Sequence, residues 1–516
     1  MRDPTSRAVR ALPLTLGLAL TAITQNALAG DPIVRAFASD GVSGDNLGED
    51  VAYDGTLAVL GAPRDAPNGT QSGSAYVFDM ATGEQMAHFV PADGAAFDSL
   101  GWAVGVSGPL GMAATYKDDD LGQGSGSAYV FDTSTGQELH KLLANDGATG
   151  DQLGFSGGLD GALVVLGAPG DDDQGSSAGA AYVFDAVTGQ QLHKLKASDG
   201  AADALFGNSS AIHGNTVIVG APGAGTTNQG AAYVFDAVTG AQLAKLTSGS
   251  AANWQYFGRE VDVSADRAIV GAPGLGAGGG AFLFSLSSFA TLDSWTPYSG
   301  NDDNFGTSVG IDGDLAVVGN WGHGGFGPFS GEARAYRASD GAELGALSAH
   351  DATLNRRFGH AVAVHGERAL VVSLTGVGVG INTGVADLFH IDGSPWENLA
   401  LGRSGSEGPP SLFTVGDLSA NSDLSFAVGD AALETNAYLV LGLLNLSAPF
   451  KNGTLVPSPD LILGPFATGL DGRFSFATVF PAGGVSGVPI HGQVWIQDGG
   501  VLPAWSATNG VVAIMP

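Results

Sequence analysis

Residues 151–184 read DQLGFSGGLDGALVVLGAPGDDDQGSSAGAAYVF, and the fold of the chain follows from this stretch. It begins with a Leu-Gly pair, runs through alternating residues to Gly-Ala-Pro, and ends, after an acidic loop, on Ala-Tyr-Val-Phe. The same order of features recurs along the chain at intervals of 48 to 53 residues. The glycines of the Leu-Gly or Phe-Gly pair, called marker glycines below, are Gly48, Gly101, Gly154, Gly207, Gly258, Gly306 and Gly359. Seven units of about 50 residues predict an all-β fold, a seven-bladed β-propeller with one four-stranded sheet per unit.

Each unit is expected to supply four strands. Strand one follows the marker glycine, and a two-residue turn such as Asp160-Gly161 leads to strand two at 163–166. An X-Gly turn favours a hairpin because its central residues need positive φ. Strand three is expected at 181–184 and a more polar strand four at 191–195. The alternating runs and the 82 glycines of the chain exclude helical repeats of similar length.

The N-terminal end of the repeats predicts a closed ring. Residues 33–41 match the strand four and exit at 192–200, although no unit precedes them. The seventh unit, in turn, loses its pattern after 385–389. We therefore expect 33–37 to supply the outer strand of blade seven, which removes open sheet edges and closes a propeller domain over 30–393.

The alternation of Phe-Gly and Gly-Ala-Pro resembles FG-GAP repeats over residues 31 to about 393. Gly-Ala-Pro is kept in four units, and units two, six and seven have Ala114-Thr115-Tyr116, Gly319-Asn320-Trp321 and Ser373-Leu374-Thr375 instead. The resemblance implies the seven-bladed propeller of integrin alpha subunits and exported bacterial proteins, with a ligand-binding face. The calcium loops of integrins, Asp-x-Asp-x-Asp-Gly between strands one and two, are replaced by two-residue turns with too few oxygens for calcium.

The regions flanking the repeats have separate patterns. Residues 1–29 combine a basic start, a short apolar run and Ala27-Leu28-Ala29, which predicts a secretory signal peptide. Residues 394–410 predict a Pro/Gly-rich linker, and 411–516 predict a C-terminal β-sandwich module. We expect no transmembrane segment after signal cleavage and a secreted or cell-surface location.

The overall composition limits the partners and chemistry. A net charge of −31 should repel phosphate backbones, so nucleic acid is not expected as a partner. The absence of cysteine excludes disulfides and thiolate chemistry. A monomer is expected.

Two acidic runs are the candidate metal site. Asp118, Asp119 and Asp120, and Asp171, Asp172 and Asp173, are expected in the strand 2–3 loops of neighbouring blades, on a face that should concentrate negative potential. Calcium is the candidate ion, and the alternative is a solvated loop face whose aspartates favour turns.

Four aromatic residues, Tyr116, Trp254, Tyr256 and Trp321, are the candidate ligand-binding residues at the edge of that face. Their rings could stack on sugars, and the expected partner is an extracellular protein or polysaccharide. For Trp321, a place in the core is the alternative.

No catalytic motif lies in a suitable context. Two G-x-S-x-G matches, at 154–158 and 306–310, open strand one of a blade rather than a strand-turn-helix elbow. The G-x-G-x-x-G at 274–279 precedes a strand, and His140 and His193 share a repeat position, which favours a structural role. We therefore expect no enzyme.

The sequence favours an exported, non-enzymatic protein for extracellular recognition or adhesion. One alternative is a carbohydrate-active or other hydrolase that uses carboxylates on the acidic face. The other is a structural scaffold in which residues 394–516 hold the protein at the surface, and deleting those residues would test it.

Overall fold

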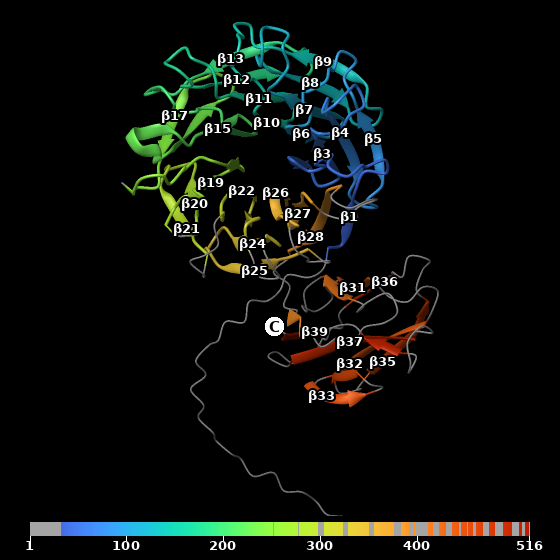
Figure 1. The fold of residues 1–516 in the computed structure, drawn as a ribbon. Helices are drawn as coiled ribbons and strands as arrows, with labels where there is room; N and C mark the ends of the chain where they lie inside the picture. The colour runs from blue at the N-terminus through green and yellow to red at the C-terminus, as the bar shows by residue number, and fades with distance from the viewer. Residues whose placement is uncertain are drawn as a thin grey trace, which may run out of the picture.

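The computed structural model describes residues 32–391, apart from gaps at 251, 277, 298–303, 324–328, 350–355 and 376–382. Beyond residue 391 it describes the backbone of separate strands. Seven four-stranded antiparallel sheets stand radially around a central axis (Figure 1). The predicted all-β, seven-bladed propeller is thus confirmed.

Each of the first six blades is continuous in sequence, with strand one nearest the axis. From the axis outward, blade one consists of β2 (Val51–Tyr53), β3 (Leu57–Ala62), β4 (Ser74–Asp79) and β5 (Gln85–Phe89). Blades two to four are β6 (Ala103–Ser107), β7 (Leu110–Thr115), β8 (Ser127–Asp132), β9 (Glu138–Leu142); β10 (Ser156–Asp160), β11 (Leu163–Ala168), β12 (Ala180–Asp185), β13 (Gln191–Leu195); and β14 (Ser209–His213), β15 (Thr216–Ala221), β16 (Ala231–Asp236), β17 (Gln242–Leu246). Blades five and six are β18 (Val261–Val263), β19 (Arg267–Gly271), β20 (Ala281–Ser285), β21 (Thr291–Trp295); and β22 (Ser308–Asp312), β23 (Leu315–Asn320), β24 (Glu332–Arg337), β25 (Glu343–Leu347).

Blade seven joins the two ends of the propeller. Its inner strands are β26 (Phe358–His365), β27 (Arg368–Ser373) and β28 (Val385–His390), and its outer strand is β1 (Val34–Ala36) from the N-terminal side (Figure 1). Arg35 of β1 is paired with Asp387 of β28 in the ladder, and its Nε donates a hydrogen bond of 2.8 Å to Oδ1 of Asp387. The Asp387 side chain is only 1% exposed, so this ion pair fixes the register of the closing strand.

The two repeated glycine motifs meet at the boundary that follows each of the four units with Gly-Ala-Pro, and blades three and four illustrate the contact. The marker Gly154 has φ 84°, and its N–H donates to the carbonyl of Gly167, in the Gly-Ala-Pro of the same blade, over 2.9 Å. A Cβ on Gly167 would lie 2.0 Å from the carbonyl oxygen of Gly207, the marker glycine of the next blade. Glycine is required at Gly167 because a side chain would collide with the neighbouring backbone.

The hydrophobic core lies between the blades rather than at the axis. Each cluster of buried side chains combines one face of a sheet with the opposite face of the next. Val77 of blade one and Phe131 of blade two belong to one such cluster, and Phe89 stacks on Phe131 with ring centroids 4.5 Å apart.

The strands beyond residue 391 form further antiparallel sheets. Their bounds are β29 (Glu397–Asn398), β30 (Ser411–Val415), β31 (Asp423–Gly429), β32 (Asn436–Gly442), β33 (Asn445–Phe450), β34 (Gly453–Pro457), β35 (Leu461–Ala467), β36 (Phe474–Val479), β37 (Pro489–Gln497), β38 (Trp505–Ala507) and β39 (Val511–Ile514). The largest sheet has the order β29-β39-β37-β32-β35. The β-sandwich predicted over 411–516 stays a prediction. The predicted signal peptide at 1–29, and the predicted linker at 394–410 apart from β29, lie outside the described residues.

Within the described residues, no helix has the length and apolar character needed to cross a membrane.

Candidate ligand site at the channel mouth

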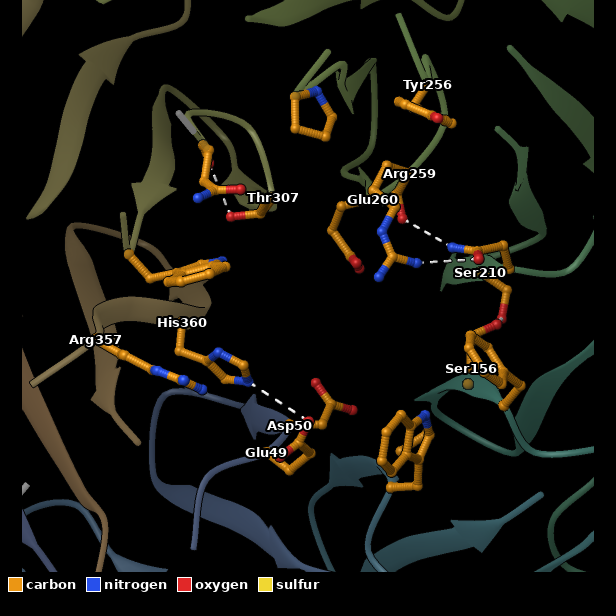
Figure 2. A pocket seen from close by; sticks show the side chains of 18 of the residues that line it. Glu49, Asp50, Ser156, Ser210, Tyr256, Arg259, Glu260, Thr307, Arg357 and His360 are labelled. Carbon is orange, nitrogen blue, oxygen red and sulfur yellow. Dashed lines mark hydrogen bonds and ion pairs between the residues drawn. The ribbon is translucent and has the colours of Figure 1, made fainter. Parts of the chain in front are cut away.

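The residue after each marker glycine lies at one end of the central channel. Each blade is entered through the 4–1 loop, which joins strand four of one blade to strand one of the next. The marker glycine turns the chain from this loop into strand one, so the next side chain reaches the opening. These residues, which define the channel mouth, are Glu49, Trp102, Phe155, Asn208, Arg259, Thr307 and His360. They line a cavity of about 620 Å³ (Figure 2). One repeat position thus supplies seven different side chains, while the backbone around it is repetitive.

Aromatic rings occupy one side of the channel mouth. Trp102 and Phe155, from neighbouring blades, both contact Tyr116, with ring centroids 4.9 and 5.4 Å from the tyrosine ring. Trp102 and Tyr116 meet edge to face, a favourable arrangement for aromatic pairs. Tyr116, which replaces the proline of Gly-Ala-Pro in blade two, therefore supports two rings that line the cavity.

The other three aromatic residues singled out in the sequence lie at the same opening. Trp321 and Tyr256 line the cavity directly. Trp254 is 56% exposed, and its ring centroid lies 6.3 Å from that of Tyr256. The structure thus brings Tyr116, Trp254, Tyr256 and Trp321 to one site, although Tyr116 and Trp254 reach it through neighbouring rings.

Two arginines line the same cavity. Arg259 donates from Nη1 to Oδ1 of Asn208 over 3.0 Å, and Asn208 returns a bond of 3.1 Å to the carbonyl of Arg259. This exchange crosses the boundary between blades four and five and orients the guanidinium. Arg357 lies over the ring of Trp321, 5.4 Å from the ring centroid, in a cation–π contact.

Two carboxyl groups inside the cavity have pKa values far from their ordinary range. Burial raises the pKa of Glu260 to about 8, and repulsion from Asp50 adds to the rise. Burial also raises the pKa of Asp50 to about 6, although the N–H groups of Val104 and Val51 donate to its carboxylate over 2.8 and 2.9 Å. Figure 2 shows both carboxyl groups pointing into the cavity from different blades. Glu260 is therefore neutral near pH 7, where it can donate a hydrogen bond to a ligand.

A histidine and a glutamate pair beside these carboxyl groups. Nε2 of His360 lies 3.7 Å from Oε1 of Glu49, and the pair joins blade seven to blade one across the boundary between these neighbouring blades (Figure 2). Burial would raise the pKa of Glu49, but the hydrogen bond from His360 lowers it below its ordinary value. Glu49 is therefore ionised at neutral pH, and its carboxylate is paired with His360.

The acidic runs proposed as calcium loops surround lysine ammonium groups. Nζ of Lys194 lies 2.7 Å from carboxylate oxygens of Asp146, Asp171 and Asp173. Although burial lowers the pKa of Lys194, these contacts raise it above its ordinary value. The cation between these carboxylates is thus the protein's own ammonium group.

The same arrangement repeats in blade two. Lys141 lies 2.8, 2.9 and 2.7 Å from Asp93, Asp118 and Asp120. Asp119 and Asp172, the middle residues of the two runs, lie outside these ammonium clusters and are exposed. No group of three or more His, Asp or Glu arranged for a metal ion occurs among the described residues. Calcium binding by Asp118–Asp120 or Asp171–Asp173 stays a prediction, and a calcium ion would have to displace a lysine.

A tyrosine completes each ammonium cluster and ties two blades together. The Tyr182 hydroxyl lies at hydrogen-bond distance from carboxylate oxygens of Asp171 (3.0 Å) and Asp146 (3.1 Å), between which its one proton is shared, and Lys194 lies 5.4 Å from the centre of its ring. Asp146 belongs to the 4–1 loop that enters the blade and Asp171 to its 2–3 loop. The Tyr of Ala-Tyr-Val-Phe and the Lys of strand four therefore connect the loops of this face.

The other motifs considered in the sequence have structural contacts. Ser156 and Ser308 of the G-x-S-x-G matches each donate to a marker-glycine carbonyl, of Gly207 and Gly359, over 2.9 Å. His140 and His193 bond through Nε2 to carbonyl oxygens of the next blade at 2.7 and 2.8 Å. These residues hold neighbouring blades together.

Sequence reasoning missed most of the channel mouth. The position after the marker glycine varies from Glu to Trp to His, so no motif marks it. Its position in the repeat was nevertheless available: seven equivalent residues at the start of the innermost strand must converge on the axis of a propeller. Aligning the units and reading that one column would have found the site.

The chain is in the class of seven-bladed β-propellers, with a cavity at one end of the central axis. The family profile described as FG-GAP repeat matches residues 33–78, 84–131, 137–184, 190–235 and 241–284. Each match runs from strand four of one blade to strand three of the next, so it spans a blade boundary. The protein is an FG-GAP repeat β-propeller. No curated protein matches the chain.

Proposed function

We propose that this protein is exported and binds an extracellular ligand at the channel mouth, as a recognition or adhesion propeller without catalytic activity. The observation that carries the proposal is the concentration of aromatic rings and arginines around one cavity of about 620 Å³ at the axis. Binding sites are typically concave, with aromatic walls and a few oriented polar groups. Export is supported by the signal-like pattern of residues 1–29.

The variable repeat column supports a binding role over a purely structural one. The marker and Gly-Ala-Pro glycines are constrained by blade contacts, whereas Trp102, Phe155 and Arg259 lie beyond those contacts and line the opening. Trp102 and Phe155 are half-buried at the opening, so part of each ring remains available for apolar contact with a ligand. The proposal therefore assigns these rings to a ligand.

Binding of the purified chain to immobilised extracellular polysaccharides and to intact cells tests this function. The Trp102→Ala and Tyr256→Ala variants should each lose binding by about tenfold or more, as expected when an aromatic anchor is removed from a site. Leu192→Ala is the matched control, because Leu192 is 42% exposed on the outer strand of blade three, away from the axis. Equal binding by all variants would contradict a site at the channel mouth.

A second candidate, hydrolysis of a glycosidic bond, is favoured by the carboxyl groups of Asp50 and Glu260. Such hydrolysis needs one protonated and one ionised carboxyl group on opposite sides of the bond. With pKa values of about 6 and 8, Asp50 and Glu260 meet the protonation requirement between those values. Both oxygens of Asp50 accept backbone hydrogen bonds, however, which also explains the residue as a link between blades one and two.

Release of reducing ends from bound polysaccharides separates the two candidates. A recognition protein retains its ligand unchanged, and Glu260→Gln has no effect on product formation. Reducing ends that appear with the wild-type chain and disappear with Glu260→Gln would establish the hydrolase instead.

A further inference from the structure

Lysine and arginine side chains in this acidic protein divide into two groups. The chain has 51 acidic and 20 basic residues, so a carboxylate partner is available to most cations. Ion pairs of 4.0 Å or less are formed by Arg35, Lys141, Lys194, Lys196, Lys245, Arg267, Arg334 and Arg337. In the part of the chain that the structure describes, no carboxylate lies at ion-pair distance from Arg64, Lys117, Arg259, Arg357 or Arg368.

Four of these five side chains gather around the channel mouth, and we call Arg64, Lys117, Arg259 and Arg357 the cation collar. Arg259 and Arg357 line the cavity. Lys117 follows Tyr116, whose ring touches the cavity-lining Trp102. Arg64 occupies in blade one the position that Gly274, a lining residue, occupies in blade five. Arg368, at the turn between β26 and β27, lies at the opposite end of the inner strands.

The collar is an electrostatic exception on this face. Lys141 and Lys194, farther from the axis, are neutralised by three carboxylates each. Arg64, Arg259 and Arg357 are exposed, and Lys117 is half-buried with its Nζ donating to Oγ of Ser99 over 3.1 Å. Uncompensated cations around a concave site favour an anionic ligand.

Aromatic rings accompany two of the four cations. Nζ of Lys117 lies 5.2 Å from the centre of the Tyr116 ring, and the Arg357 guanidinium 5.4 Å from that of Trp321. A third cation, Arg259, lines the same cavity as Tyr256. A sugar ring with an acidic substituent presents an apolar C–H face for the aromatic ring and an anion for the cation next to it. Arginine in particular binds carboxylate and sulfate oxygens through parallel hydrogen bonds.

The carboxyl groups of the cavity do not prevent an anion from binding at the collar. Glu49 is paired with His360, and the Asp50 carboxylate accepts two backbone N–H bonds. Glu260 is neutral near pH 7, as described above, and can donate a hydrogen bond to a sugar hydroxyl or carboxylate. The floor of the cavity thus supplies polar contacts while the collar supplies positive charge.

We infer that the channel mouth binds an acidic polysaccharide, one whose sugar rings carry carboxylate or sulfate groups, in preference to a neutral glycan. The inference rests on the proposed recognition function and names the ligand class of the same site. Carboxylated and sulfated polysaccharides share a sugar ring with an anionic substituent. Binding experiments with both kinds of sugar show which anion, carboxylate or sulfate, the site prefers.

Calorimetric or fluorescence titration of the purified chain tests the inference with charged oligosaccharides and their neutral forms. The probes are oligogalacturonate and its methyl ester, alginate oligomers and their esters, and a sulfated carrageenan oligomer with its desulfated form. At least one acidic oligomer should bind about tenfold or more tightly than its neutral form, the contribution expected of one charge-assisted hydrogen bond. Preference for the uronates identifies carboxylate as the anion, and preference for carrageenan identifies sulfate.

Charge-removing variants locate the interaction. The double variant Arg259→Gln/Arg357→Gln should lose about tenfold or more in affinity for the acidic oligomer and little for its neutral form. Arg368→Gln, at the far end of the inner strands, is the matched control and should bind as the wild type does. Thermal unfolding of all three proteins checks that they fold alike.

The outcomes separate this inference from the proposed function. If neutral oligomers bind as tightly as acidic ones and Trp102→Ala abolishes that binding, the site is a glycan site and the acidic preference is wrong. If no oligosaccharide binds, the inference falls, and cell or protein binding that depends on Trp102 would leave the recognition function standing. Unchanged affinity of the double variant for an acidic oligomer also overturns the inference.

Discussion

Nζ of Lys194 lies 2.7 Å from a carboxylate oxygen of Asp171, a side chain that is only 4% exposed. Two more carboxylates at the same distance enclose the ammonium group. The lysine therefore holds the place that a bound cation would take, and it lies on strand four rather than in the acidic loop itself. This relationship decides how the acidic face should respond to metal ions.

We expect calcium to raise the midpoint of thermal unfolding only after the lysine is removed. Lys194→Met leaves Asp146, Asp171 and Asp173 facing one another, which should destabilise the blade and make stability calcium-dependent, since a ligand that binds only the folded state stabilises it. The measurement is thermal unfolding in chelator and in millimolar calcium. Lys196→Met, which removes a more exposed partner of Asp173, is the control. A large calcium shift in the wild-type chain would show that calcium displaces the lysines.

The Gly-Ala-Pro glycine should tolerate no side chain. In Gly167→Ala the new Cβ would lie 2.0 Å from the Gly207 carbonyl oxygen, so the two blades must separate. We expect a loss of about 3 kcal/mol or more in the free energy of unfolding, at the upper end for overpacking. Gly214→Ala is the control, because Gly214 has φ 56° but open space around it, and should cost only about 1–2 kcal/mol. Denaturant unfolding of both variants measures the difference.

Removing Arg35 from the closing strand β1 should take away the guanidinium that pairs with Asp387 of β28. Arg35→Met leaves the carboxylate of Asp387, 1% exposed, without the guanidinium, and breaking such a buried pair costs about 3–5 kcal/mol. Arg337→Met breaks an exposed pair with Asp340 and should cost less than about 1 kcal/mol. Equal unfolding free energies for the two variants would contradict the role assigned to Arg35.

Stability should fall as the pH rises from about 5 to 8. The pKa of Glu260 is raised from 4.5 to about 8, and burial raises that of Asp262 from 3.8 to about 7. The folded state therefore keeps protons that the unfolded state has released in this range, so each group stabilises fully below its unfolded pKa and loses that effect through its folded pKa. Thermal unfolding of Glu260→Gln across this range should show a shallower decline than the wild type. An equally steep decline would assign the dependence to other groups.

Affinity for an acidic oligosaccharide should rise as the pH falls from about 8 to 6. Glu260 and then Asp50 take up protons in this range, which removes negative charge beside the ligand, while Arg259 and Arg357 stay charged. Glu49, its partner His360 and Tyr256 are further titratable groups that line the cavity, and repulsion from Asp262 also acts on Glu260. Titrations at several pH values should show the trend in the wild type and a weaker one in Glu260→Gln. Affinity that falls with decreasing pH in the wild type would contradict this account.

The repeat pattern made the architecture predictable and the site only partly so. Marker glycines and Gly-Ala-Pro are constrained by backbone contacts that recur at four of the blade boundaries, so both motifs remain visible in the sequence. Tyr116 and Trp321 could be singled out because each stands where other units have proline. Glu260 and Asp50 could not, because their properties depend on burial at the axis, which only the assembled ring creates. The lysines of the acidic face were missed for a related reason: Lys194 and Asp171 are 23 residues apart and meet only through strand pairing.

The pairing of β1 with β28 has a consequence for biogenesis. Arg35 and Asp387 are separated by 352 positions, so during synthesis or export β1 can pair with β28 only after the whole propeller has been made or translocated. Until then six complete sheets form an arc whose two ends are open, and both unpaired edges are exposed to other chains. Intermediates of this protein should therefore be captured by factors that protect strand edges, and an excess peptide spanning residues 32–41 should compete for the vacant edge of β28 during refolding.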